Sequence, residues 1–353
     1  MSIWTRAVST LLRRAPAPVA APAVVAQARL PVDAADDDAP TTLAIDPAAH
    51  QAAVEALQRP YIAWLCGLPQ EPAAAIGNAA RDALLARLDA ATATDAQCNA
   101  LLPRAPQVVP QLMKALRDEH YASTDVAERL SRDAELATEA IRLANQKQRA
   151  DREPISDLAH AVTAIGASGL RSVISKSVLR PMFDVRGTSL SARASKQIWK
   201  DGDRKARLGS ALAANDLLDP LDGYLSGLLH NTGWTALLRA LDAIPDAAAI
   251  LPGACLDAGF VDALVRRRDR LFGRLVRPWD VGPVMNALAD ELAGPGLATA
   301  RSPLGRILHY ADRLAMLHAV ARSERLPEHD FGAHLAHLPA PVRDCYVTTL
   351  GRS

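Results

Sequence analysis

The sequence predicts an all-α fold, on three observations. Apolar residues recur at spacings of three and four through most of the chain, as on one face of a helix. Capping residues precede several of these stretches, and no segment of four or more residues shows the alternation and β-branched enrichment of a strand. With 353 residues, of which 49% are hydrophobic, the chain is long enough to bury a sizeable core.

Residues 1–42 are predicted to form a disordered linker. Their composition is dominated by alanine, proline and valine, and prolines at positions 16, 18, 22 and 31 remove backbone donors that helices and sheets require. The first residues, from Trp4 to Arg14, allow two interpretations, a frayed chain end or an amphipathic helix on a membrane surface.

Residues 43–98 are predicted to form a helical extension that packs as an accessory layer. Asp46 and Pro47 supply an N-cap and a first-turn proline. Apolar residues then follow at helical spacing through Leu65, and a second helix is expected from Ile76 to Leu88. Tyr61 and Trp64 in the first helix are either buried against the main domain or anchors for a partner protein.

The helical pattern becomes dense after Leu101. A helix is expected over residues 108–116, another opens after Asp133, and a third follows Ile155 and Ser156. Gly166 and Gly169 are expected to interrupt the third.

One histidine stands out in the segment from Gly227 to Gly233. An apolar helix leads to His230, and we expect it to end at the glycine that follows. The next residue, Asn231, carries a neutral amide, which binds a hard metal ion less strongly than the carboxylate of an aspartate would.

Six short motifs in a fixed order resemble the HDOD family, a group of bacterial helical modules related to HD phosphohydrolases. They are Leu102-Pro103-x-x-Pro106, Leu130-Ser131-Arg132-Asp133-x-x-Leu136, Ile141-Arg142-Leu143-Ala144-Asn145, Ile155-x-x-Leu158-x-x-Ala161-Val162-x-x-Ile165-Gly166, Leu170-Arg171 and Gly227-Leu228-Leu229-His230. The resemblance implies an HDOD domain over 99–290, with helices of residues 291–353 packing on its HD-like core.

The same resemblance implies a degenerate metal site. An HD hydrolase uses a distal histidine, a His-Asp doublet and a late aspartate, whereas the corresponding residues here are Asp201, His230, Asn231 and Asp312. We therefore expect a regulatory module without enzymatic activity, cofactor or metal. The alternative is a divergent phosphohydrolase that binds metal through Asp201, His230 and Asp312 and acts on a nucleotide or cyclic dinucleotide. If no metal binds, His230 is expected to be a buried structural histidine hydrogen-bonded to a neighbour, with Asp312 as its partner. A third possibility is a protein that binds nucleic acid or a second messenger through Arg266, Arg270, Arg274 and Arg277.

Arginines at positions 266, 270, 274 and 277 fall at helical spacing and form a candidate partner-binding stripe, which Arg267 and Arg268 would widen. The stripe is either a site for an acidic partner or anionic second messenger, or a solvated helix face balanced by nearby acids.

Charge and cysteine content restrict the partners only loosely. The net charge is +1, so nucleic acid is not an expected partner, and signalling proteins are the main expectation. Four dispersed cysteines fit a reducing, cytoplasmic location. No apolar run is long enough to span a bilayer.

Overall fold

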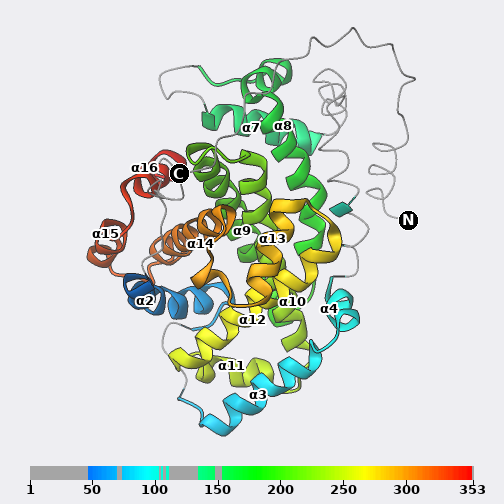
Figure 1. Ribbon diagram of the computed structural model, residues 1–353, viewed down its shortest axis with the longest axis vertical. Coiled ribbons are helices and arrows are strands. Elements are labelled where there is room, and N and C mark those ends of the chain that lie inside the picture. The colour runs from blue at the N-terminus through cyan, green and yellow to red at the C-terminus, as the bar shows by residue number, and fades with distance from the viewer. Residues whose placement is uncertain are drawn as a thin grey trace, which may run out of the picture. The chain divides into compact units, whose positions relative to one another are not determined.

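The computed structural model describes residues 47–69, 74–102, 105, 109–110, 134–147 and 153–351. None of these residues lies in a β-strand, so the predicted all-α fold class is confirmed (Figure 1). The predicted linker over 1–42 and most of the helix expected over 108–116 lie outside the described residues. None of the described helices is long and apolar enough to cross a membrane.

In the part of the chain that the structure describes, three helices precede the region of the family motifs. They are α2 (Pro47–Leu65), α3 (Asn78–Ala91) and α4 (Asp95–Leu101). Helix α2 packs against two helices from the C-terminal half of the chain, α12 (Ala258–Val276) and α14 (Pro303–Arg322). Leu57 and Tyr61 of α2 are buried in the main hydrophobic core. This contact brings an N-terminal helix against the late helices of the fold.

Helices α7 (Ala134–Lys147) and α8 (Leu158–Phe183) pack against each other around a small hydrophobic core of their own. Asn145, from the third family motif, holds this pair together, because its amide both donates to and accepts from the backbone of Ile155, at 2.9 and 2.7 Å. Gly166 kinks α8 with a φ of 65°, a conformation that glycine adopts at little cost. The predicted interruption is therefore a kink, and Gly169 continues the helix beyond it.

Among the described helices, α9 (Leu190–Asn215) and α10 (Pro220–Asp242) pack against each other most extensively. Asp242, at the end of α10, accepts hydrogen bonds from the first backbone amides of α9, which makes the two helices antiparallel neighbours. Glycine lets their backbones approach closely, since a Cβ at Gly227 would lie 2.4 Å from the carbonyl carbon of Lys205. Such an approach places short polar side chains of both helices within hydrogen-bonding distance.

The remaining helices complete the layer around α9 and α10. They are α11 (Ala247–Ala254), α12, the 3-10 turn η1 (Arg277–Trp279), α13 (Pro283–Ala293), the 3-10 turn η2 (Leu297–Thr299), α14, α15 (Glu328–Ala336) and α16 (Ala340–Thr349). Side-chain caps fix the starts of α12 and α14: Asp257 accepts from the amide of Phe260 at 2.8 Å, and Ser302 accepts from the amide of Gly305 at 3.0 Å.

The expectation that the helix ends just after His230 is wrong. Helix α10 continues to Asp242, and His230 lies in its middle. Gly233 has a packing role, because a Cβ there would lie 2.3 Å from the carbonyl oxygen of Arg268 on α12. A glycine that permits close helix packing and a glycine that ends a helix look alike in a single sequence.

Gly233→Ala is expected to destabilise the protein by about 1–3 kcal/mol, because its methyl group would push α10 and α12 apart. Urea denaturation measures this change. Gly332→Ala in α15 is the matched control, since nothing lies within 4 Å of a Cβ there. The control should be as stable as the wild type or gain roughly 0.5–1 kcal/mol. Equal stability of the Gly233→Ala variant and the wild type would contradict the packing role.

Candidate functional site

Eight polar side chains from five helices meet inside the protein, and we call them the buried polar cluster. They are Tyr61 from α2, Asp201 and Lys205 from α9, His230 and Asn231 from α10, Arg268 and Asp269 from α12, and Asp312 from α14. All eight are buried, and the most accessible of them, Asp312, is only 6% exposed. The structure thus brings together the four positions singled out in the sequence, Asp201, His230, Asn231 and Asp312.

Lys205 lies at the centre of the cluster, and sequence reasoning missed it. Its Nζ atom is 2.9 Å from Oδ1 of Asp312 and 3.1 Å from Oδ2 of Asp201. The same ammonium donates to Oδ1 of Asn231 and lies 3.5 Å from Nδ1 of His230. One fully buried lysine therefore contacts all four positions.

A signal for Lys205 was present in the sequence. Asp201 and Lys205 stand four residues apart, and they continue a core-facing row of α9 that includes Ile198, Leu208 and Leu212, all of them buried. A lysine on such a row needs a buried partner, because an uncompensated charge is costly to bury.

Asn231 uses both ends of its amide. Its oxygen accepts from Lys205, while its Nδ2 donates to the carbonyl of Ile198 at 2.7 Å and to Oδ2 of Asp201 at 3.1 Å. An aspartate here would lose the two donated hydrogen bonds and place a second carboxylate against Asp201. Tyr61 adds a further hydrogen bond to the same Oδ2 of Asp201, at 2.8 Å. The amide is the group that suits this environment.

His230 is neutral in this environment. Burial lowers its pKa to about 4, and the positive charges of Arg268 and Lys205 act in the same direction. Its Nε2–H donates to Oδ1 of Asp269 at 3.1 Å, which leaves the Nδ1 lone pair facing Lys205. Asp312 is farther away, with Oδ1 at 3.7 Å from Nδ1. The hydrogen-bond partner of His230 is thus Asp269, and the expectation of Asp312 is wrong.

Arg268 provides the second cation of the cluster. Its Nη1 lies 3.1 Å from Oδ2 of Asp312, its Nε lies 2.8 Å from Oδ1 of Asp269, and its guanidinium stacks 5.4 Å from the ring centre of Trp234. Burial opposes the ionisation of Asp312, but Arg268 and Lys205 outweigh it and hold the pKa of Asp312 well below its usual range. Arg268 is 1% exposed, so the expectation that it widens a surface patch is wrong.

The cluster does not fit a divalent cation. The carboxylate and imidazole lone pairs that a metal would need already accept from Lys205 and Arg268 or face them. A dication at the same place would lie against an ammonium. Among the described residues, no group of three or more His, Cys, Asp or Glu side chains is arranged to hold a metal ion.

The arginine stripe does not form one continuous exposed row. Arg266 is 58% exposed and pairs with Asp262, whereas Arg274 is half-buried between α12 and α4, where its Nη2 lies 2.7 Å from Asp95. Arg277 follows the end of α12 in η1 and pairs with Asp290 of α13 at 2.9 Å. Arg270 is exposed. Three of the four charges are thus balanced by nearby acids, and a role of the stripe in partner binding stays a prediction.

Comparison with known proteins supports the family resemblance. Residues 102–250 match the family model described as HDOD domain. A protein of Treponema pallidum with no assigned function is 27% identical over 138 residues, which cover 37% of this chain and 25% of the relative's own length.

Solved structures of low sequence identity are also similar to this chain. A Geobacter sulfurreducens HDOD domain protein of unknown function is 20% identical, with a TM-score of 0.47, over 71% of this chain and 85% of its own. A Shewanella amazonensis protein, provisionally named a phosphohydrolase, is 20% identical, with a TM-score of 0.49, over 76% of this chain and 95% of its own.

Lys205→Met is expected to destabilise the protein by about 3–5 kcal/mol, because it leaves the buried carboxylate of Asp201 without a cation and Asp312 with Arg268 alone. Lys200→Met is the matched control, since Lys200 is exposed on the same helix, and it should change stability by less than about 0.5 kcal/mol. Urea denaturation of both variants measures the difference. Unfolding of the two variants at the same urea concentration would show that Lys205 does not hold the cluster.

Stability should fall as the pH drops from about 6.5 to about 4. His230 titrates near 6.5 when unfolded and at about 4 when folded, so the unfolded state binds more protons in this window. The contribution of His230 is complete above pH 6.5 and amounts to roughly 3 kcal/mol. His318, whose pKa burial also lowers to about 4, adds to the same trend.

Denaturant titrations between pH 7 and pH 4 measure this dependence. His230→Gln retains a donor for Asp269 but cannot titrate, so its stability should vary less with pH than that of the wild type. An equal loss of stability in the wild type and in His230→Gln between pH 7 and pH 4 would contradict the contribution of His230.

Proposed function

We propose that this chain, which contains a segment matching the HDOD domain family, acts in bacterial signalling by binding a partner rather than by hydrolysing a phosphoester. The observation that carries this proposal is the buried ammonium of Lys205, which contacts all four positions where an HD hydrolase would hold its metal. The match of residues 102–250 supports the signalling part.

An ammonium cannot replace the chemistry of a metal ion. Hydrolysis at an HD-type site needs a cation that binds water and lowers the pKa of that water to about 7. Lys205 has three N–H donors, and Asp201, Asn231 and Asp312 offer three acceptors for them. No donor is left for a water or a substrate oxygen. The same three contacts tie α9 to α10 and α14, which makes the lysine a structural cation.

The partner is proposed to be another signalling protein or an anionic second messenger in the cytoplasm. Arg266, Arg270 and Arg277 are the exposed members of the arginine stripe and the ones that an acidic surface could reach. Each exposed pair would contribute only about 0.2–1 kcal/mol, so several contacts would have to act together.

Hydrolysis of a model phosphodiester, bis(p-nitrophenyl) phosphate, tests the proposal. With added Mn²⁺ or Mg²⁺, the purified full chain should release p-nitrophenol at the background rate. Elemental analysis should find far less than one equivalent of Mn, Fe, Zn or Mg in the protein. Activity above background that His230→Ala abolishes and Lys200→Ala preserves would establish the alternative, a divergent metal-dependent phosphohydrolase.

A further inference from the structure

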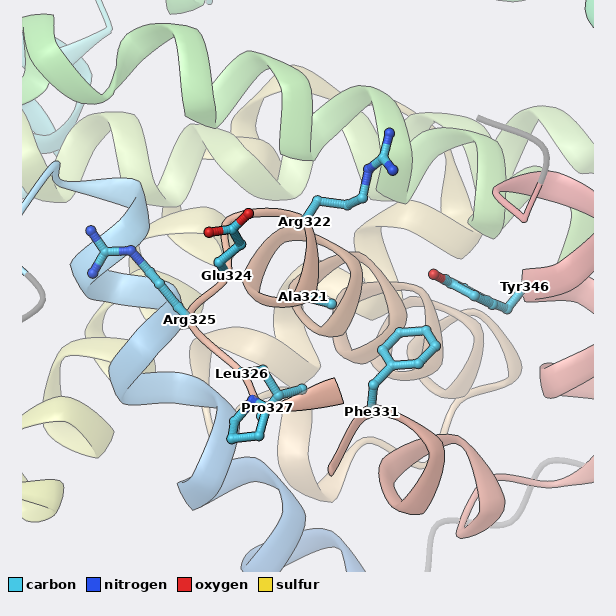
Figure 2. A pocket seen from close by; sticks show the side chains of 8 residues that line it. All are labelled: Ala321, Arg322, Glu324, Arg325, Leu326, Pro327, Phe331 and Tyr346. Atoms are coloured by element: carbon cyan, nitrogen blue, oxygen red, sulfur yellow. The ribbon is translucent and has the colours of Figure 1, made fainter. Parts of the chain in front are cut away.

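A second feature of the molecule lies outside the segment that matches the HDOD family. A pocket of about 660 Å³ opens where the end of α14, the loop that follows it, α15 and α16 meet (Figure 2). Figure 2 shows Phe331 and Tyr346 on one side of the pocket, Arg325 on the opposite side and Arg322 at the last turn of α14. Its volume lies within the range of about 300–1,000 Å³ that is usual for small-molecule sites.

Two aromatic rings form an ordered wall of this pocket. The rings of Phe331 and Tyr346 have centroids 5.9 Å apart at an angle of 57°. The hydroxyl of Tyr346 is held by Nδ1 of His318 at 3.0 Å, and Tyr346 is only 7% exposed, so this ring is fixed in place. Phe331 is half-buried and offers part of its ring to the pocket. Such a wall suits a planar ligand, because stacking on aromatic side chains tolerates different rings.

The surroundings of the Tyr346–His318 pair are rich in arginine. Burial raises the pKa of Tyr346, and the positive charges of Arg322 and Arg204 oppose that rise. Burial lowers the pKa of His318 to about 4, and Arg204, Arg322 and Arg207 lower it further, against a weaker opposing effect of Asp201. Arginines of α9 and α14 therefore lie close enough to influence the same pair of side chains.

Acids compensate this positive charge only in part. Asp203 lies 3.7 Å from Arg207 and also pairs with Lys176 at 2.7 Å. Within the pocket, Glu324 is the one lining acid, against the two lining arginines Arg322 and Arg325. Arg204 packs against Trp64, and among the described residues its buried Nη1 has no hydrogen-bond partner. The guanidinium of Arg325 donates to the carbonyl of Leu68 at 2.9 Å, so the pocket combines an aromatic wall with one lining arginine, Arg322, that is left for a ligand.

We propose that this pocket binds a small molecule with a planar ring and a phosphate, the chemistry of a mononucleotide. The ring would stack on the accessible part of Phe331, which the buried Tyr346 supports from behind, and Arg322 would pair with the phosphate, because guanidinium and phosphate form strong charge-assisted hydrogen bonds. The site is separate from the buried polar cluster, so the proposal holds whether or not the chain hydrolyses phosphoesters.

Equilibrium dialysis of the full chain against defined probes tests this proposal. AMP or GMP should bind saturably at one site per chain. Adenosine and guanosine lack the phosphate, and inorganic phosphate lacks the ring, so each should bind at least about tenfold more weakly.

Two variants locate the site. Arg322→Gln and Phe331→Leu should each weaken nucleotide binding about tenfold, through loss of the phosphate contact and of stacking respectively. Arg301→Gln, at an exposed arginine outside the pocket, is the control and should bind as the wild type does. Thermal melting followed by circular dichroism verifies that each variant folds. If Phe331→Leu does not fold, the binding measured for Arg322→Gln alone tests the proposal.

Three results would overturn the proposal. They are the absence of saturable nucleotide binding, nucleoside binding as tight as nucleotide binding, and nucleotide binding that Arg322→Gln leaves unchanged.

Discussion

The contact between the ammonium of Lys205 and the carboxylates of Asp201 and Asp312 is the interaction on which the rest of the structure depends. Both distances are close to 3 Å, and none of these groups has substantial access to water. Charges buried in this way are tolerated only when each one keeps its partner. The helices that carry them, α9 and α14, must therefore hold the same relative position, and α10, which packs on both, supplies the amide of Asn231.

The buried polar cluster extends beyond the segment that matches the family. Asp201, Lys205, His230 and Asn231 lie within residues 102–250, whereas Tyr61, Arg268, Asp269 and Asp312 lie outside. Without the outer residues, Lys205 would lose one of its carboxylates and His230 would lose its acceptor. Helices α2, α12 and α14 therefore complete the electrostatic core of the domain, and this gives the extension around α2 a role beyond covering a surface.

Part of the fold could be predicted from the sequence because helices leave local signals. The start of α2 at Pro47, the start of α7 after Asp133 and the break at Gly166 followed from capping and glycine patterns. Gly233 was wrongly predicted to end the helix, because its contact with α12 joins residues that are far apart in the sequence. A lone sequence records only that a glycine is present.

The candidate site could be predicted only in part, for a similar reason. The motifs pointed to Asp201, His230, Asn231 and Asp312, but which side chain fills the space between them depends on how α9 is rotated against its neighbours. Arg268 was assigned to the surface because its neighbours Arg266, Arg267 and Arg270 are charged. Along α12, only two positions separate the buried Arg268 from the exposed Arg266 and from the exposed Arg270.

Anomalous diffraction from crystals soaked in Mn²⁺ tests the central claim most directly, because it locates a metal ion by position. We expect no anomalous peak among Asp201, His230 and Asp312. The ammonium of Lys205 should still lie between the carboxylates of Asp201 and Asp312. A peak at that position, with Lys205 displaced from the cluster, would contradict it.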